Sequence, residues 1–270
     1  HMLKEKYGMH PLVVTWAPHI YTEIGRKNLT SFIDSGFDNI LITPNGVVHR
    51  KLTKAAFIEM GDPFQPFIFG QYSAPFRTAI HYKVGLVFYG EDGEVEYGGS
   101  TQNKDNPFFD VKFTVKHYFE GDHKKICEMS NLSKDELYSF TFDEKELSEN
   151  DLKLTHYGYF EPWDSYKNYL FAKQKYPFQE SEKANVGTFT NFAQNDQAFF
   201  ALHTYLMYLK FGFGRATQDA GIEIRRGAMT RDQAKNLVKL YDNQYPKEFE
   251  RLYLDYYQMD IDEFDKILDK

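Results

Sequence analysis

Pro11-Leu12-Val13-Val14-Thr15-Trp16 is a short apolar run, rich in β-branched residues, that predicts a buried β-strand. Two more runs of the same kind follow it along the chain, residues 39–43 and residues 84–89. Helical patterns separate the three runs, and strands joined through helices pair in parallel by right-handed crossovers. The first ninety residues therefore predict an α/β fold, a parallel sheet with helices on both faces.

The helical connections have recognisable ends. Residues 22–35 place apolar side chains on one helical face, and Gly36 ends that pattern. A short helix is expected around residues 51–60, ending at Gly61. Another is expected to begin near Ser73, with Pro75 in its first turn, where a missing N–H is tolerated.

The rest of the chain is predicted as two further parts. Residues 98–190 are read as mixed and irregular. From residue 195 the sequence is helical: an apolar stripe runs to Gly212, Thr230 to Gln233 form a capping box, and helices follow Pro246 and Met259. We expect an α/β domain over 1–118, an irregular region over 119–190 and a C-terminal helical region over 191–270.

Composition excludes several classes of protein. The 270 residues are 42% hydrophobic and 26% charged, with a net charge of −7, which argues against nucleic acid as the main partner. No apolar run has the ~20 residues of a membrane span. A single cysteine, Cys127, excludes an internal disulfide framework and a multi-cysteine zinc site. We therefore expect a cytoplasmic protein without a membrane partner.

Ligands of open parallel sheets bind beyond the carboxyl ends of the strands. The last such end carries Glu91, Asp92, Glu94 and Glu96 among four glycines between residues 90 and 99. Glycine lets a phosphate approach the backbone, and clustered carboxylates suit a hard cation such as Mg²⁺. The alternative interpretation is a solvated turn.

A second group of candidates is basic and lies at a glycine-rich helix end: Lys210, Arg215, Arg225 and Arg226. Guanidinium groups suit phosphate or carboxylate recognition. The alternative interpretation is an ordinary basic helix end that interacts with the helix dipole and with Asp219 and Glu223. Phosphate-loop, serine-nucleophile and His-Glu-x-x-His signatures are absent. The scattered histidines and Cys127 are interpreted as packing or surface residues.

The long motifs in the second half resemble those of the N-acetyl sugar amidotransferases, in particular the members linked to pseudaminic and legionaminic acid biosynthesis. The resemblance rests on residues 191–197, 209–217 and 224–231, with residues 57–61 and 90–99 fitting the same group. It covers nearly the whole chain.

This resemblance implies an ATP pyrophosphatase fold of the adenine-nucleotide α-hydrolase type, with ATP and Mg²⁺ as cofactors. The enzyme would adenylate the acetamido oxygen of a nucleotide-linked or free sugar, and ammonia from a glutaminase subunit would displace AMP to leave an acetamidino group. The products would serve surface glycans such as those of flagellin.

By position, the resemblance also suggests roles for individual residues. Thr15, Trp16, Ala17, Asn45 and Gly90 would bind the nucleotide. Glu91, Asp92 and Glu94 would be catalytic, with Glu91 and Asp92 holding Mg²⁺. Lys210, Arg215, Arg225 and Arg226 would contact phosphates or an acidic sugar.

The sequence departs from the family at one point. Relatives carry a Ser-Gly-Gly-Lys-Asp phosphate loop after a first strand, and no Ser-Gly-Gly-x-Asp occurs in this chain. We therefore expect a chain truncated before residue 1, with weak or no ATP turnover and two unpaired strand edges unless homo-oligomerisation or rearrangement covers them.

Two other functions compete with this one. A tRNA-modifying thiolase of the same fold would need a catalytic cysteine pair and a basic face, and one cysteine with a net charge of −7 argues against it. A non-enzymatic sugar-binding or assembly module would use the 17% aromatic content and would bind sugar without nucleotide.

Overall fold

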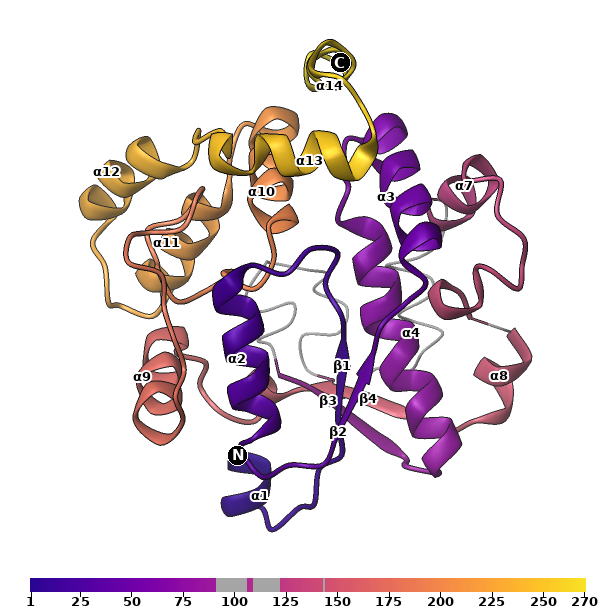
Figure 1. The fold of residues 1–270 in the computed structure, drawn as a ribbon. Helices are drawn as coiled ribbons and strands as arrows, with labels where there is room; N and C mark the ends of the chain where they lie inside the picture. The colour runs from indigo at the N-terminus through magenta and orange to yellow at the C-terminus, as the bar shows by residue number, and fades with distance from the viewer. Residues whose placement is uncertain (91–105, 109–121, 143) are drawn as a thin grey trace.

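The structure is a computed structural model that describes residues 1–90, 106–108, 122–142 and 144–270 (Figure 1). It is an α/β structure followed by a helical C-terminal region. Its first part comprises α1 (Met2–Glu5), β1 (Val13–Trp16), α2 (Glu23–Ile33), β2 (Asn39–Ile42), α3 (Gly46–Met60), α4 (Gln65–Tyr82) and β3 (Leu86–Tyr89).

A middle part and the C-terminal helices follow. The middle part comprises α7 (Asp122–Met129), η3 (Tyr138–Phe140), α8 (Glu144–Glu149), β4 (Lys153–His156), η4 (Tyr157–Tyr159) and α9 (Ser165–Lys175). The C-terminal part comprises α10 (Phe199–Phe211), α11 (Arg215–Arg225), α12 (Arg231–Tyr241), η5 (Lys247–Phe249), α13 (Glu250–Tyr257) and α14 (Ile261–Leu268).

The four named strands pair in parallel, as expected, but they form two pairs rather than one sheet. β1 pairs with β2, with Val13 opposite Asn39, and β3 pairs with β4, with Leu86 opposite Lys153. β4 comes from the segment interpreted as irregular. The three expected strands therefore all exist, but β3 pairs with residues 67 positions further along the chain, not with β1 or β2.

Local capping explains where α2 and α3 begin. The side chain of Thr22 accepts a hydrogen bond from the N–H of Gly25 at 2.9 Å, and that of Asn45 accepts one from Val47 at 3.0 Å. α3 ends at Gly61, which has φ of 58°, a left-handed conformation that glycine adopts without strain. In Figure 1, α2 lies on one side of β1, while α3 and α4 lie on the other.

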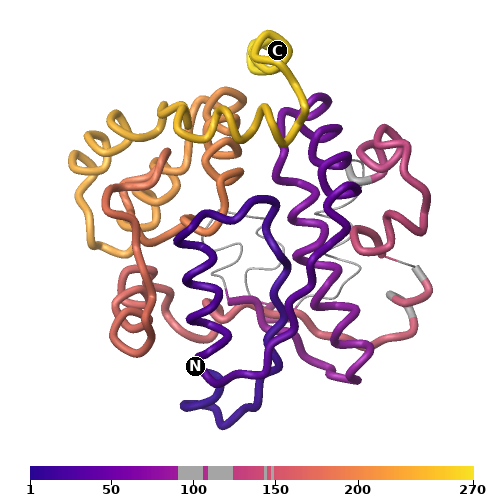
Figure 2. Tube along the Cα trace, in the orientation of Figure 1, coloured from indigo at the N-terminus to yellow at the C-terminus, as the bar shows by residue number. Residues whose placement is uncertain are grey.

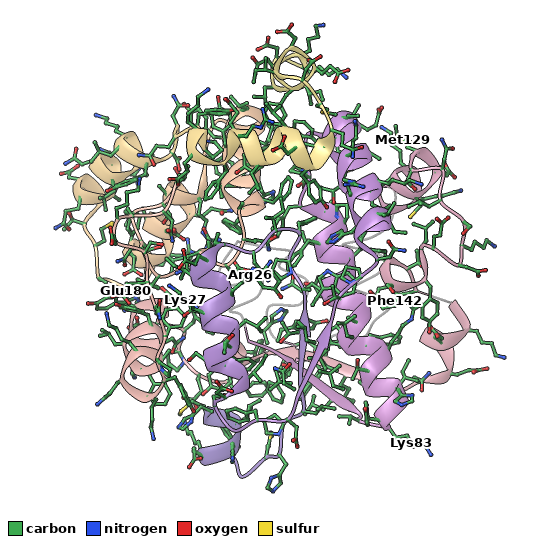
Figure 3. All side chains as sticks on the ribbon, in the orientation of Figure 1. Arg26, Lys27, Lys83, Met129, Phe142 and Glu180 are labelled. Carbon is green, nitrogen blue, oxygen red and sulfur yellow. The ribbon has the colours of Figure 1, made fainter. Side chains whose placement is uncertain are left out.

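The helix expected to begin near Ser73 begins at Gln65, so the prediction of its start was wrong. Pro66, not Pro75, stands in the first turn, and Pro75 lies inside the helix. Burial outweighs the cost of the interior proline, because Phe69, Ala74 and Phe76 on either side of it are at most 5% exposed. The helix ends at Lys83 (Figure 3), where the backbone turns left-handed with φ of 55°.

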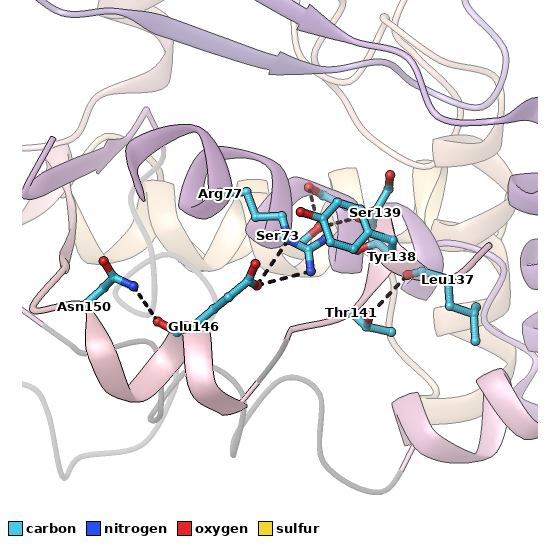
Figure 4. Close-up of polar contacts among 9 residues, drawn as sticks. Ser73, Arg77, Leu137, Tyr138, Ser139, Thr141, Glu146 and Asn150 are labelled. Atoms are coloured by element: carbon cyan, nitrogen blue, oxygen red, sulfur yellow. Dashed lines mark hydrogen bonds and ion pairs between the residues drawn. The ribbon is translucent and has the colours of Figure 1, made fainter. Parts of the chain in front are cut away.

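The main core lies between α3 and α4 and is closed by α7 and η3. Its fully buried members include Leu52, Ala56, Phe69 and Ile126. Polar contacts hold η3 on α4 (Figure 4): the Ser73 hydroxyl donates to the carbonyl of Ser139 at 2.5 Å, and the Arg77 guanidinium donates to the carbonyl of Tyr138. Arg77 also pairs with Glu146 of α8 at 3.4 Å.

The C-terminal helices pack on α3 through a second aromatic core. Phe57 of α3 stacks on Tyr257 of α13 with ring centroids 4.8 Å apart, and Phe199 of α10 is fully buried beside them. The expected capping box of Thr230 and Gln233 is present at α12. The tube in Figure 2 shows this region lying across the end of α3 and above α2. α11 was not predicted from the sequence.

Within the residues that the structure describes, no helix combines the length and the apolar character needed to cross a membrane.

Candidate functional site

A cavity of about 680 Å³ lies between β1 and β3, and we call it the interstrand cavity. All four residues of β1 and all four of β3 line it. Phe32 of α2 and Phe37 border it on one side, and α4 borders it with Phe67, Gln71 and Ala79. Two strands and two helices thus border the cavity, and it reaches the carboxyl ends of both strands.

Three of the five residues expected to bind a nucleotide meet here. Thr15, Trp16 and Gly90 line the interstrand cavity. Ala17 is 2% exposed, and its N–H donates to the carbonyl of Ile42 at 2.9 Å. Asn45 uses its side-chain oxygen to cap α3. The structure therefore brings β1 and β3 together as the strand-end argument predicts, while Asn45 serves the neighbouring helix end.

The indole of Trp16 packs directly against the backbone of Gly70 in α4. A Cβ atom at Gly70 of α4 would lie 1.9 Å from Cε2 of the Trp16 indole, so only glycine fits there. The indole is 6% exposed, and its Nε1–H has no hydrogen-bond partner among the described residues. A buried unsatisfied donor is uncommon, and it marks this end of β1 as a candidate site.

The chemistry of the cavity wall is mostly apolar. Among its described lining residues, the titratable side chains are His1, His10 and Tyr89, with no lysine, arginine, aspartate or glutamate. Such a wall fits an apolar or aromatic group. It does not fit a triphosphate or Mg²⁺, which need cationic side chains and carboxylate oxygens respectively.

The carboxylates expected to be catalytic or to hold Mg²⁺, Glu91, Asp92 and Glu94, lie outside the described residues. In the part of the chain that is described, no three His, Cys, Asp or Glu side chains are grouped so as to hold a metal ion.

The sequence reasoning missed a buried histidine pair beyond the end of β1. The rings of His19 and His49 stack with centroids 4.0 Å apart, and the Nδ1 atom of His19 lies 3.2 Å from Oε1 of Gln197. Burial lowers the pKa of His19 from 6.5 to about 4 and lowers that of His49 well below 6.5. Both rings are therefore neutral at pH 7. The one sequence signal was their place, each shortly after a strand end.

The motif at residues 191–197 is joined to this end of β1 by main-chain bonds. The N–H of Thr22 donates to the carbonyl of Asp196 at 3.0 Å, and the N–H of Ala198 donates to that of Ile20 at 3.1 Å. Tyr21 and Gln197 form an isolated antiparallel bridge. The C-terminal region therefore contributes directly to the strand end.

The four expected phosphate or substrate residues do not converge. Arg215 begins α11 and Arg225 ends it, so a rise of about 15 Å separates their backbones. Lys210 donates to the carbonyl of Met60 at 2.8 Å, and Arg226 forms ion pairs with Asp164 and Glu223.

Arg215 is engaged inside the protein. It is 8% exposed, and its Nε lies 2.7 Å from Asp219. Burial raises the pKa of Asp219 above its ordinary value, although Arg215 and the Thr188 hydroxyl, at 2.6 Å, both act to lower it. Nearby, Asp242 accepts from the N–H groups of Gly214 at 2.8 Å and Thr217 at 3.0 Å, which caps α11.

Residues 186–270 match a family model for the C-terminal domain of proteins like the LPS biosynthesis protein WbpG. The match contains all the motifs of residues 191–231 described above, and it associates this part of the chain with glycan biosynthesis. No curated protein matches the chain.

Proposed function

We propose that this chain is the catalytic part of a glycan-biosynthesis enzyme, an ATP-dependent amidotransferase that converts a sugar acetamido group into an acetamidino group. The proposal rests mainly on the backbone contact between the segment after β1 and residues 195–198, which we call the joint. The C-terminal region that matches the WbpG-like model is bonded by its main chain to the segment after β1, through Thr22 and Ala198. These bonds place the family-matched region against the end of the α/β part where, in this proposal, the ligand binds.

Nonulosonic acid derivatives of the pseudaminic and legionaminic type are the sugars that the motif resemblance suggests. ATP would supply the adenylyl group that turns the acetamido oxygen into a leaving group, and ammonia from a glutaminase subunit would take its place. In this proposal the chain's own described contribution is the apolar pocket at Thr15, Trp16 and Gly90, which accepts a flat apolar surface such as a purine. Handling of phosphates and Mg²⁺ falls to residues outside the described part, among them Glu91 and Asp92.

The lone cysteine supports this proposal over a thiolase. Burial raises the pKa of Cys127 from 9.0 to about 11, so its thiol is poorly suited to act as a nucleophile at neutral pH. Catalysis through a cysteine persulfide would need a cysteine whose pKa is lowered, so that its thiolate forms at neutral pH.

The test measures AMP and pyrophosphate after mixing protein, ATP, Mg²⁺, ammonium chloride and a CMP-linked N-acetylated nonulosonic acid. One arm uses residues 1–270 alone, and the other uses the same residues preceded by a strand that ends in Ser-Gly-Gly-Lys-Asp. We expect AMP release that needs both sugar and ammonia in the second arm, and little in the first. If neither arm forms AMP with any acetamido sugar, the proposal fails.

Sugar binding without nucleotide would favour the non-enzymatic module instead. Calorimetry distinguishes the two: the enzyme proposal expects binding of AMP or ATP to residues 1–270 and an effect of nucleotide on sugar affinity. Heat from the sugar alone, unchanged by nucleotide, would contradict it. The test variant is Trp16→Leu. It removes an aromatic ring from the cavity wall and should weaken nucleotide binding more than sugar binding.

A further inference from the structure

A histidine–aspartate pair connects the family-matched region to the α/β part outside the interstrand cavity. Nδ1 of His203 in α10 lies 3.1 Å from Oδ1 of Asp62, which stands in the turn between α3 and α4. Asp62 also accepts from the N–H of Phe64 at 3.0 Å, which fixes the position of its carboxylate. Neither His203 nor Asp62 lines the interstrand cavity, so the pair has no role in the pocket described above.

The ionisation of Asp62 decides which nitrogen of His203 carries a proton. Burial acts to raise the pKa of Asp62, but His203, the N–H of Phe64 and Lys210 outweigh it, so the pKa lies below its ordinary value. The carboxyl is therefore ionised at neutral pH, and an ionised carboxylate only accepts hydrogen bonds. Nδ1 of His203 must then be the donor. When the ring is neutral, its lone pair is on Nε2.

The ring of His203 is fixed in orientation, but its Nε2 atom is open. Phe64 and Phe200 pack against the ring, with centroids 4.9 and 5.9 Å away. No hydrogen bond among the described residues engages Nε2, and the side chain is 26% exposed, so a ligand can reach that atom. In His19 and His49, by contrast, Nε2 is buried. An oriented imidazole with a free lone pair has the geometry of a general base.

The His203–Asp62 pair lies near the end of β1, where the proposed function places the reaction. Phe64 packs on His203 and also on His19, which follows β1, with ring centroids 6.3 Å apart in the second contact. His203 stands five residues after Ala198 of the joint, a rise of about 7.5 Å along α10. In Figure 1, α10 lies beyond the carboxyl end of β1. Contacts from both parts of the molecule thus place the pair beside the joint.

We propose that His203 is the general base of amidine formation and that Asp62 is the residue that positions it. This inference rests on the proposed function. The lone pair of ammonia attacks the carbon that carries the adenylylated oxygen, and a C–N bond forms. Nε2 of His203 accepts a proton from the new ammonium group, and the nitrogen's electron pair expels AMP as the C–O bond breaks. The imidazolium, stabilised by the Asp62 carboxylate, then releases its proton to solvent.

The test uses His203→Asn in residues 1–270 preceded by the strand that ends in Ser-Gly-Gly-Lys-Asp. The asparagine amide can still donate to Asp62, but it has no basic nitrogen. The kcat/KM for ammonia, measured as AMP release at pH 7.5, should fall at least about 100-fold, the usual contribution of a general base. His81→Asn, at an exposed histidine of α4, is the matched control and should keep the rate.

A second nucleophile distinguishes a base from a contact that only holds α10 in place. The hydroxylamine adduct carries an electron-withdrawing oxygen and is acidic enough to lose its proton to water. His203→Asn should therefore keep most of its rate with hydroxylamine, and added imidazole should restore part of the rate with ammonia. Equal losses with both nucleophiles, or full activity with ammonia, would overturn the inference. Absence of AMP from the unsubstituted restored chain would instead overturn the proposed function, and this inference with it.

A further measurement needs no turnover. Side-chain nitrogen NMR of residues 1–270 with ¹⁵N-labelled histidine should show neutral His203 with its proton on Nδ1. Asp62→Asn should weaken that preference and, in the restored chain, lower kcat/KM for ammonia at least about tenfold, because an amide does not stabilise the imidazolium. A proton on Nε2 in the unsubstituted protein would contradict the proposal, whatever the activity.

Discussion

His19, which follows β1, and His49 of α3 stack ring on ring with centroids 4.0 Å apart, and the Nε2 atom of each is buried without a hydrogen-bond partner among the described residues. The pair lies where three parts of the molecule meet. His19 contacts Phe67 of α4 and Phe199 of α10, and His49 belongs to α3. A proton added at Nε2 of either ring would find no acceptor among the described residues.

Acid should therefore destabilise the protein. Burial lowers the pKa of His19 and of His156 from 6.5 to about 4, and it lowers that of His49 as well. The unfolded chain binds protons near pH 6.5 and the folded one does not until about pH 4, so the stabilisation is complete above pH 6.5 and is lost between those values. Each histidine contributes up to about 1.4 kcal/mol per pH unit.

Urea unfolding between pH 7.5 and 4.5 measures this slope. His19→Gln should reduce the slope, and the same replacement at the exposed His81 is the matched control. Equal slopes for wild type and His19→Gln would show that the ring is not buried in its neutral form.

Gly25→Ala should separate α2 from the C-terminal region. A Cβ atom there would lie 2.2 Å from the carbonyl oxygen of Asp196, and the other close atoms are also backbone. No side chain can move to relieve the overlap, so we expect a loss of about 2–4 kcal/mol in the free energy of unfolding. Gly46→Ala, with open space around its Cβ, is the control and should change stability by less than about 1 kcal/mol.

The role of Arg215 can be decided by stability. If it serves as an internal partner of Asp219, Arg215→Ala should cost about 3–5 kcal/mol, because a buried carboxylate is left without its cation. Arg215→Lys should recover only part of that loss. The exposed Arg231, replaced in the same two ways, provides the matched control. Full stability of Arg215→Ala would instead favour the role in phosphate or substrate binding.

Cys127 should react slowly with iodoacetamide. Its pKa of about 11 compared with 9.0 lowers the thiolate fraction about 100-fold at pH 8. Alkylation rates followed by mass spectrometry, in buffer and in urea that unfolds the chain, check this expectation. A rate in buffer equal to that in urea would contradict it.

The strands of the α/β part could be predicted because their signals are local. Residues 13–16, 39–42 and 86–89 each lie within a predicted apolar run, and the capping box at Thr230 is a property of four neighbouring residues. β4 could not be predicted, since Lys153–His156 contains only one apolar residue, Leu154, and its strand conformation comes with its pairing to β3. The start of α4 was misplaced because Pro75 was taken for a first-turn residue, whereas burial of its neighbours carries the helix through it.

The candidate site also has features that the sequence predicts and features that it does not. Proximity of Thr15, Trp16 and Gly90 follows from parallel strands ending at one edge, a rule that sequence can apply. The partnership of Arg215 with Asp219, or of His19 with Gln197, depends on side-chain directions and on contacts 4 and 178 residues apart. The sequence around a basic residue near glycines does not indicate whether that residue forms an ion pair inside the fold.

The joint between the segment after β1 and residues 195–198 is made largely of main-chain bonds, from Thr22 to Asp196 and from Ala198 to Ile20. Every residue except proline carries these groups, so most substitutions at these four positions leave both bonds intact. Substitutions at these four positions should therefore leave the segment after β1 and the C-terminal region in the same register.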